Sequence, residues 1–203
     1  MARTAGSDGS RTEEAIRAAA VSLIAAHGFE AMTMRQLAER VGLQPGALYR
    51  YFPSKAQLLA TLQVAHLESL LAQWATEAPA SADPLDRLRA FVDFHVRCHT
   101  LRRDEVFVAN MELRSLTATD YRRVVALRAR YESILISILA DGQAAGVFEL
   151  PDPKVAAFAM LAMLTGVGTW YRDSGRIAKR DLVAMYTRLA LQCAGVAHAE
   201  LAA

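Results

Sequence analysis

The stretch QPGALYRYFPSK, residues 44–55, carries residue types suited to contact with a nucleic acid. A helix that begins at its first proline and turns 100° per residue places Leu48 and Phe52 near one face. Gly46 and Arg50 fall on the opposite face. There a backbone without a side chain permits close approach, and a guanidinium can make a bidentate contact to guanine. The pattern predicts a short helix that reads DNA.

Several polar groups beside this helix suit phosphate contacts, which position a protein on DNA without reading its sequence. Helix N-termini also favour phosphate, because their backbone amides are unpaired. The candidates are Tyr49, Tyr51 and Lys55, together with the helix starts expected at Thr33 and Ser54. The alternative is that the aromatic side chains only pack a small bundle. We accept that alternative for Phe52, whereas the faces of Tyr49 and Arg50 favour DNA contact.

A second group of residues, His95, Cys98 and His99, has spacing that could bind a metal. Positions i, i+3 and i+4 share one face of a helix, and imidazole and thiolate are zinc ligands. No fourth ligand is evident in the sequence, and the segment already has a packing role. We therefore predict no metal site and no resident cofactor.

The composition restricts the class of protein. The chain has 203 residues, 53% of them hydrophobic, and a net charge of +2, so positive charge for a polyanion must be local. Two cysteines without paired spacing and an N-terminus without an apolar stretch predict a cytoplasmic protein. The uncharged segment 155–171 is slightly short for a membrane span, and a helix buried on several sides is favoured over membrane attachment.

Helix-start signals divide the chain. Capping boxes are expected at Ser10–Glu13, Thr33–Gln36 and Ser54–Gln57, and Asp-Pro starts at residues 83–84 and 152–153. Apolar residues between these signals recur at helical spacing, as at Ile16, Ala20, Leu23 and Ile24. We predict an all-α protein of about nine helices. It has a flexible arm over 1–10, a DNA-binding domain over 11–53 with its helix-turn-helix motif at about 33–52, and a larger domain over 54–203.

The segment TMRQLAERVGLQPGALYRYFPSKAQLL, residues 33–59, resembles the DNA-binding domain of the TetR family of bacterial repressors. The resemblance covers about residues 11–60. Position 50 often carries histidine in that family and carries arginine here, which leaves the operator sequence open. The resemblance implies DNA contacts by Thr33, Arg35, Gln44, Pro45, Gly46, Ala47, Tyr49, Arg50 and Lys55.

The family resemblance also implies that the larger domain binds a small molecule and forms a homodimer. We expect the dimer through segments 153–172 and 178–195, with Leu164 and Leu189 at the interface, and binding to a palindromic double-stranded DNA operator. The last helix places Leu182, Met185, Tyr186, Leu189 and Cys193 on one face. Candidate ligand-binding residues are Phe91, His95, Phe107, Met111, Arg114, Tyr131, Met163 and Trp170.

The segments NMELRSLT, residues 110–117, and WYR, residues 170–172, look like the branch of the family that responds to acyl-CoA thioesters. An acyl chain needs an apolar tunnel, and the CoA phosphates need cations at its mouth. Candidate cations are Arg102, Arg103, Arg114, Arg172 and Arg176. The alternative effector is a lipophilic drug, as for regulators of efflux pumps.

Two other classes of function compete with a repressor. An all-helical enzyme is disfavoured because the sequence has no nucleophile elbow, phosphate loop or metal-ligand set. A membrane-attached protein would have to use segment 155–171. We therefore expect a ligand-responsive repressor that is not an enzyme and does not bind a membrane.

Overall fold

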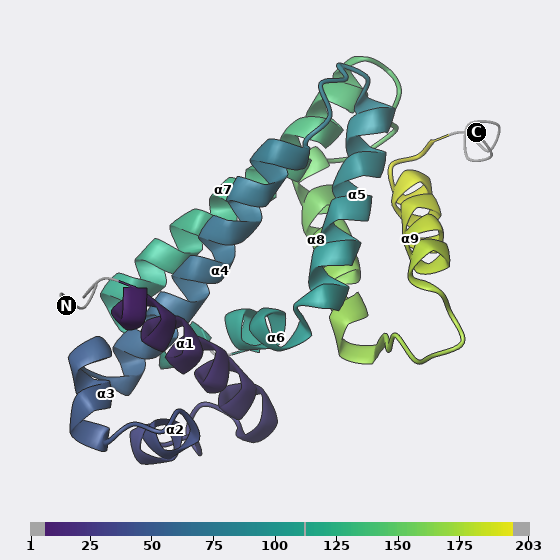
Figure 1. Ribbon diagram of the computed structural model, residues 1–203. Coiled ribbons are helices and arrows are strands. Elements are labelled where there is room, and N and C mark those ends of the chain that lie inside the picture. The colour runs from purple at the N-terminus through teal and green to yellow at the C-terminus, as the bar shows by residue number, and fades with distance from the viewer. Residues whose placement is uncertain (1–6, 112, 197–203) are drawn as a thin grey trace. The chain divides into compact units, whose positions relative to one another are not determined.

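The computed structural model describes residues 7–111 and 113–196. These residues form nine α-helices and one short 3-10 helix, with no strand among them, so the all-α prediction is confirmed (Figure 1). The elements are α1 (Ser7–His27), α2 (Met34–Arg40), α3 (Pro45–Tyr51), α4 (Lys55–Glu77), α5 (Pro84–Leu101), α6 (Arg103–Met111), η1 (Leu113–Ser115), α7 (Ala118–Ala144), α8 (Pro153–Trp170) and α9 (Lys179–Cys193).

Most of the predicted helix starts are present. Thr33 caps α2 with a reciprocal box, in which the Gln36 backbone N–H donates to Thr33 Oγ1 at 3.2 Å and the Thr33 N–H donates to Gln36 Oε1 at 2.9 Å. The Gln57 N–H donates to Ser54 Oγ at 3.1 Å. Asp83 and Asp152 each accept from backbone amides of the helix that follows, and each precedes a proline. Local side-chain chemistry therefore decides where these helices begin.

The predicted start of the first helix was wrong. α1 begins at Ser7, so Ser10 and Glu13 lie inside it, and residues 7–10 do not form the predicted arm. No proline stands between residues 7 and 10 to stop the helix from extending toward the N-terminus. Residues 1–6 of the predicted arm lie outside the described residues.

The first of two compact units contains the described residues up to His66 and those from Asp104 to Val125. It therefore extends beyond the predicted boundary at residue 53. Its core includes Leu58, Leu59 and Leu62 of α4, and Val108 of α6 is buried in the same cluster. The other buried members are Ile16, Ala20, Ile24, Phe29, Met32, Met34, Leu37, Ala38, Leu48 and Phe52. The helices of the predicted DNA-binding domain are thus packed against α4 and α6.

The second unit contains residues 67–103 and the described residues from 126 onward. In this unit α5 packs against both α8 and α9 (Figure 1). An aromatic cluster lies at its centre. The ring of Trp74 lies 5.3 Å from that of Phe91 and 5.4 Å from that of Phe94, centroid to centroid. Large aromatic and aliphatic side chains therefore fill this unit, as its sequence composition predicts.

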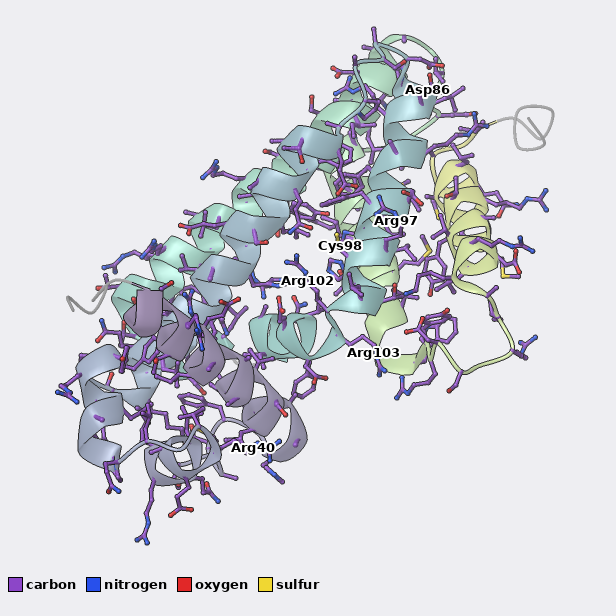
Figure 2. The ribbon with its side chains drawn as sticks, in the orientation of Figure 1. Arg40, Asp86, Arg97, Cys98, Arg102 and Arg103 are labelled. Carbon is purple, nitrogen blue, oxygen red and sulfur yellow. The ribbon has the colours of Figure 1, made fainter. Side chains whose placement is uncertain are left out.

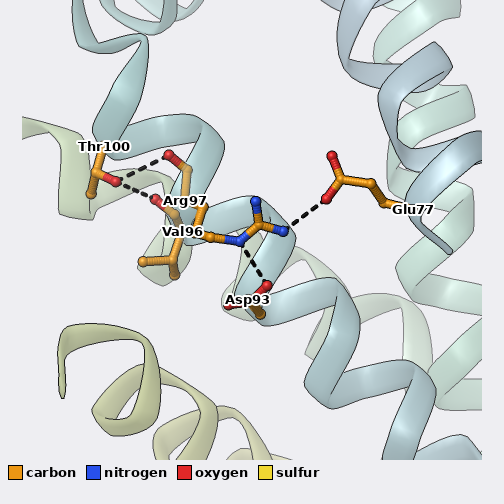
Figure 3. A network of polar contacts seen from close by, with 5 residues as sticks. All are labelled: Glu77, Asp93, Val96, Arg97 and Thr100. Carbon is orange, nitrogen blue, oxygen red and sulfur yellow. Dashed lines mark hydrogen bonds and ion pairs between the residues drawn. The ribbon is translucent and has the colours of Figure 1, made fainter. Parts of the chain in front are cut away.

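Arg97 joins α4 to α5 inside the second unit (Figure 3). Its Nη2 donates to Glu77 Oε2 at 2.8 Å and its Nε donates to Asp93 Oδ2 at 2.7 Å. These two carboxylates raise the pKa of the Arg97 guanidinium above its ordinary value. The side chain is 43% exposed, so the network lies at the surface and orients the end of α4 against α5.

α8 departs from the prediction that it is buried on several sides. Ala157, Met160, Leu164 and Val167 are buried, at the spacing of a single helical stripe. Val155 and Phe158 are exposed, at 63% and 44%. In the single chain, α8 therefore has one covered and one uncovered apolar face. None of the helices described by the structure is long and apolar enough to cross a membrane.

Candidate DNA-reading helix and polar ligand-binding core

The turn between α2 and α3 depends on a glycine. Gly42 has φ +69°, a conformation that side-chain-bearing residues rarely adopt. Its N–H donates to the carbonyl of Glu39, and the N–H of Leu43 donates to the carbonyl of Ala38 at 2.8 Å. This is the Schellman pattern, which closes the end of a helix and reverses the chain. The result is a tight turn that sets the direction of α3.

α3 has two different faces, as the sequence predicts. Leu48 is fully buried and Phe52, its C-terminal cap, is nearly so, and both belong to the core of the first unit. Gly46 and Arg50 are exposed, and Tyr49 is 48% exposed. A seven-residue helix is unstable by itself, so the packing of Leu48 and Phe52 holds α3 in place. The exposed face presents a backbone without a side chain next to a long cation.

The surface around α3 carries local positive charge. Between residues 31 and 55 the sequence has Arg35, Arg40, Arg50 and Lys55, and Glu39 is the acidic residue. Glu39 pairs with Arg35, whose Nε lies 3.2 Å from Glu39 Oε1. Arg50 makes no ion pair with any residue that the structure describes, and Arg40 is exposed on the last turn of α2 (Figure 2). A near-neutral protein therefore concentrates cations where a polyanion would bind.

Lys55 has a structural contact that the sequence did not reveal. Its Nζ donates to the backbone carbonyl of Glu30 at 3.1 Å and lies 4.3 Å from the centre of the Phe29 ring. The ammonium group has three donors, so two remain for a phosphate. Lys55 thus ties the start of α4 to the loop before α2 while keeping donors for the predicted contact.

The other residues in the predicted DNA-binding set also lie in the first unit. Thr33, Arg35, Gln44 and Pro45 are exposed, and Ala47 is partly buried. Gln44 is the N-cap of α3, but its side chain makes no capping hydrogen bond, which leaves the amide available to another partner. These residues lie at and near the N-terminal ends of α2 and α3, which are the positions that contact DNA in a helix-turn-helix.

The second unit contains a polar chain inside its apolar core. His95 on α5 is 1% exposed. Its Nδ1 lies 3.0 Å from the hydroxyl of Tyr131 on α7, and its Nε2 lies 3.2 Å from Thr165 Oγ1 on α8. Its ring stacks on that of His99 at 3.7 Å, and His99 Nδ1 donates to the His95 carbonyl at 2.9 Å. Three helices therefore meet at one imidazole.

The predicted ligand-binding residues divide between the two units. Phe91, His95 and Tyr131 lie together, with ring centres 5.5 to 5.9 Å apart, and Met163 packs against the same core. Trp170 is half exposed, and its ring contacts are with Tyr171 and Tyr186. Phe107 and Arg114 belong to the first unit, and the side chain of Met111 lies outside what the structure describes.

Sequence reasoning missed Thr165. The available signal was a hydroxyl inside an uncharged helix, where a polar group needs a partner. That partner, His95, lies 70 positions away, so no local pattern indicates it. Among the described residues, no group of three or more His, Cys, Asp and Glu side chains is placed to hold a metal ion.

A helix, a tight turn and a second helix with an exposed cationic face define a DNA-binding protein of the helix-turn-helix class. Residues 16–62 match the family model of bacterial regulatory proteins of the tetR family. Residues 81–194 match the model of the tetracyclin repressor-like C-terminal domain. The protein belongs to the TetR family of transcriptional regulators.

Individual relatives span nearly the whole chain. The transcriptional repressor KstR2 of Mycobacterium tuberculosis is 26% identical over 194 residues, which cover 94% of this chain and 96% of that protein. The crystal structure of a tetR-family regulator from Rhodococcus RHA1 has a TM-score of 0.87 at 30% identity, covering 92% of this chain and 98% of that one. AibR, solved with isovaleryl coenzyme A and operator DNA, has a TM-score of 0.82 at 23% identity, covering 88% and 97%, and so shares the fold.

Proposed function

We propose that the protein is a repressor that binds a palindromic operator as a homodimer and is released by an acyl-CoA thioester. The observation that carries the proposal is the two-faced α3. Leu48 anchors the helix in the core, while Gly46 and Arg50 face outward in a region of positive charge. Arginine is the side chain best suited to read guanine, because its fork matches two acceptors on that base.

The exposed apolar residues of α8 and α9 support a homodimer. Val155 and Phe158 on α8 and Met185 and Leu189 on α9 are each at least 43% exposed. Apolar residues gathered on two neighbouring helices are characteristic of protein interfaces. Leu164, which we expected at the interface, is fully buried in the core of its own chain, so Leu189 is the better position for testing the interface. Two copies of α3 would then read two half-sites.

The interior of the second unit supports an apolar effector with one polar group. Phe91, Phe94 and Trp74 supply apolar surface, and His95 and Tyr131 place polar atoms within it. AibR, which shares the fold, was solved with an acyl-CoA, and KstR2 is described as a ketosteroid transcriptional regulator. Either a long-chain or a ring-bearing acyl-CoA suits this interior. The acyl tail would contribute about 0.8 kcal/mol for each buried methylene.

Arginines at the helix ends of the second unit support recognition of the CoA phosphates. Arg102 and Arg103 lie at the end of α5 and the start of α6 (Figure 2). Arg102 Nη1 donates to Ser69 Oγ at 3.0 Å, and Arg103 Nε donates to the carbonyl of Gly168 at 2.8 Å. Each contact holds the charge of the guanidinium at a defined position. Arg172 and Arg176 are exposed on the α8–α9 connection.

The test begins with selection of operator sequences from random duplex DNA by the purified protein. Release from the selected operator is then titrated with acyl-CoAs of increasing chain length, with free CoA and with the free fatty acids. We expect release by the long-chain thioesters, with up to about fourfold greater potency for each added methylene, and weak release by free CoA or the free acids. A flat response to every thioester, with release by a cationic dye, would instead favour an efflux regulator.

A further inference from the structure

The polar chain formed by Tyr131, His95 and Thr165 leaves one hydrogen-bond donor unused. A phenol, a neutral imidazole and a threonine hydroxyl each carry one polar hydrogen, so the chain has three donors. The two contacts at His95 Nδ1 and Nε2 use two of them. A protonated imidazole would leave two donors over. At least one hydroxyl at an end of the chain therefore has a hydrogen to donate to a further group.

The chemistry of the three groups indicates that this hydroxyl is Thr165. A phenol is a stronger donor than an aliphatic alcohol, and burial raises the pKa of the Tyr131 phenol well above its ordinary value, so the phenol keeps its proton. With His95 in the tautomer that carries its hydrogen on Nε2, Tyr131 donates to His95 Nδ1 and His95 Nε2–H donates to Thr165 Oγ1. The stacked ring of His99, hydrogen-bonded to the His95 carbonyl, restricts rotation of the His95 ring.

Thr165 also differs from four other helical threonines of this chain. A threonine in a helix commonly donates to a carbonyl three or four residues earlier. Thr61, Thr76, Thr100 and Thr169 do so, at 2.8 to 2.9 Å. Thr165 has no hydrogen bond besides the one with His95 among the described residues. A Cβ added to the neighbouring Gly166 would meet no heavy atom within 4 Å apart from the backbone of its own helix. The backbone beside Thr165 is therefore not closely packed.

We propose that the Thr165 hydroxyl donates to the carbonyl oxygen of the effector and that His95 and Tyr131 are positioning residues that orient it. An apolar molecule with one acceptor oxygen, such as the thioester carbonyl of an acyl-CoA, satisfies the remaining donor. This inference rests on the proposed function and adds which atom of the effector is recognised. Selectivity for the acceptor arises because an analogue without it leaves the Thr165 donor unpaired in a site filled by the acyl chain.

The experiment compares two ligands of equal length, dodecanoyl-CoA and its thioether S-dodecyl-CoA, in which a methylene replaces the carbonyl. Binding to the full-length protein is measured by isothermal titration calorimetry. We expect the wild-type protein to prefer the thioester by roughly tenfold or more, because the Thr165 hydroxyl, which is partly exposed in the free protein, would lose access to water in the complex and find no acceptor in the thioether. Thr165→Val, which replaces the hydroxyl with a methyl group of similar size, should bind the two ligands about equally, and it should bind the thioether more tightly than the wild-type protein does because no donor is left unpaired.

Two variants separate recognition from stability. Tyr131→Phe should retain Thr165 but weaken its orientation, giving an intermediate preference for the thioester. Thr100→Val is the matched control, because it removes a buried hydroxyl that donates to its own helix, and it should keep the full preference. Thermal unfolding of each variant checks that it is folded at the temperature of the titration.

The outcomes separate this inference from the proposed function. Equal binding of thioester and thioether by the wild-type protein would contradict carbonyl recognition and leave the acyl-CoA effector standing. Retention of the preference in Thr165→Val would contradict the role of Thr165 in the same way. Binding of neither ligand would overturn the acyl-CoA proposal and this inference together.

Discussion

The two units place their polar groups in opposite ways. In the first unit, Leu37 and Leu48 are fully buried while Arg50 and Tyr49 point to the outside of α3. In the second, His95 and Tyr131 are buried at the centre and large apolar residues are exposed on α8 and α9. This difference is the one expected if the first unit binds DNA, which is too large to be enclosed, and the second unit encloses a small effector, as we propose. The following changes test that division.

The largest effect is expected from the exposed apolar face of the second unit. Leu189→Glu places a charge on that face and should convert a dimer to a monomer, lowering operator affinity by about 10²- to 10⁴-fold through loss of the second half-site. Sedimentation velocity measures the mass, and fluorescence anisotropy with the operator measures the affinity. Arg180→Glu, at an exposed polar position of α9, is the control and should remain dimeric. A monomeric wild-type protein that still binds tightly would contradict the dimer.

The next effect concerns the buried side of α3. Leu48→Ala removes a fully buried side chain and should lower the free energy of unfolding of the first unit by about 2–5 kcal/mol. Chemical denaturation followed by circular dichroism measures it. Tyr49→Ala is the neighbouring half-exposed control and should weaken operator binding with little change in stability. Equal losses of stability from both variants would show that α3 does not have two distinct faces.

A smaller and more specific effect is expected on the exposed side of α3. Arg50→Ala should cost about 1–3 kcal/mol at one base position of each half-site and relax the sequence preference there. Lys55→Ala should weaken binding to all sequences alike and reduce the dependence of affinity on salt. Anisotropy titrations over a set of operator variants at two salt concentrations distinguish the two. An unchanged preference in Arg50→Ala would rule out its role in base reading.

The smallest effect is expected from the surface network of the second unit. Arg97→Met keeps the aliphatic part of the side chain but removes the contacts with Glu77 and Asp93. Because the side chain is 43% exposed, the loss of stability should be about 0.2–1 kcal/mol and should shrink at high salt. Denaturation at low and high ionic strength measures it. A loss of several kcal/mol would show that Arg97 contributes far more to the stability of the second unit than an exposed ion pair does.

The sequence predicted what depends on neighbouring residues. The caps at Thr33, Asp83 and Asp152 and the two faces of α3 follow from local hydrogen bonding and helical spacing, and the structure has them. Contacts across long stretches of chain could not be read in this way. The burial of Val108 in the core of the first unit and the bond between His95 and Thr165 depend on how separate helices pack.

The DNA contacts assigned to residues 33–55 therefore stay predictions with a consistent geometry, since their types and exposure agree with the role. The candidate ligand-binding residues were harder to predict from the sequence. Phe107 and Trp170 have the apolar character of a pocket, but Phe107 belongs to the first unit and Trp170 packs against Tyr186. An aromatic residue on a helix has the same sequence signature whether it lines a pocket, fills a core or covers a surface.

α4 is one continuous helix from Lys55 to Glu77, and it contributes to both units. Leu58 and Leu62 lie in the first core, and Leu70 and Trp74 lie in the second. The two binding equilibria therefore share a structural element, and thermodynamic reciprocity applies to them. If the bound effector lowers the affinity for the operator by some factor, the bound operator lowers the affinity for the effector by the same factor. A cell with many occupied operators would consequently need more effector to respond than measurements on the free protein indicate.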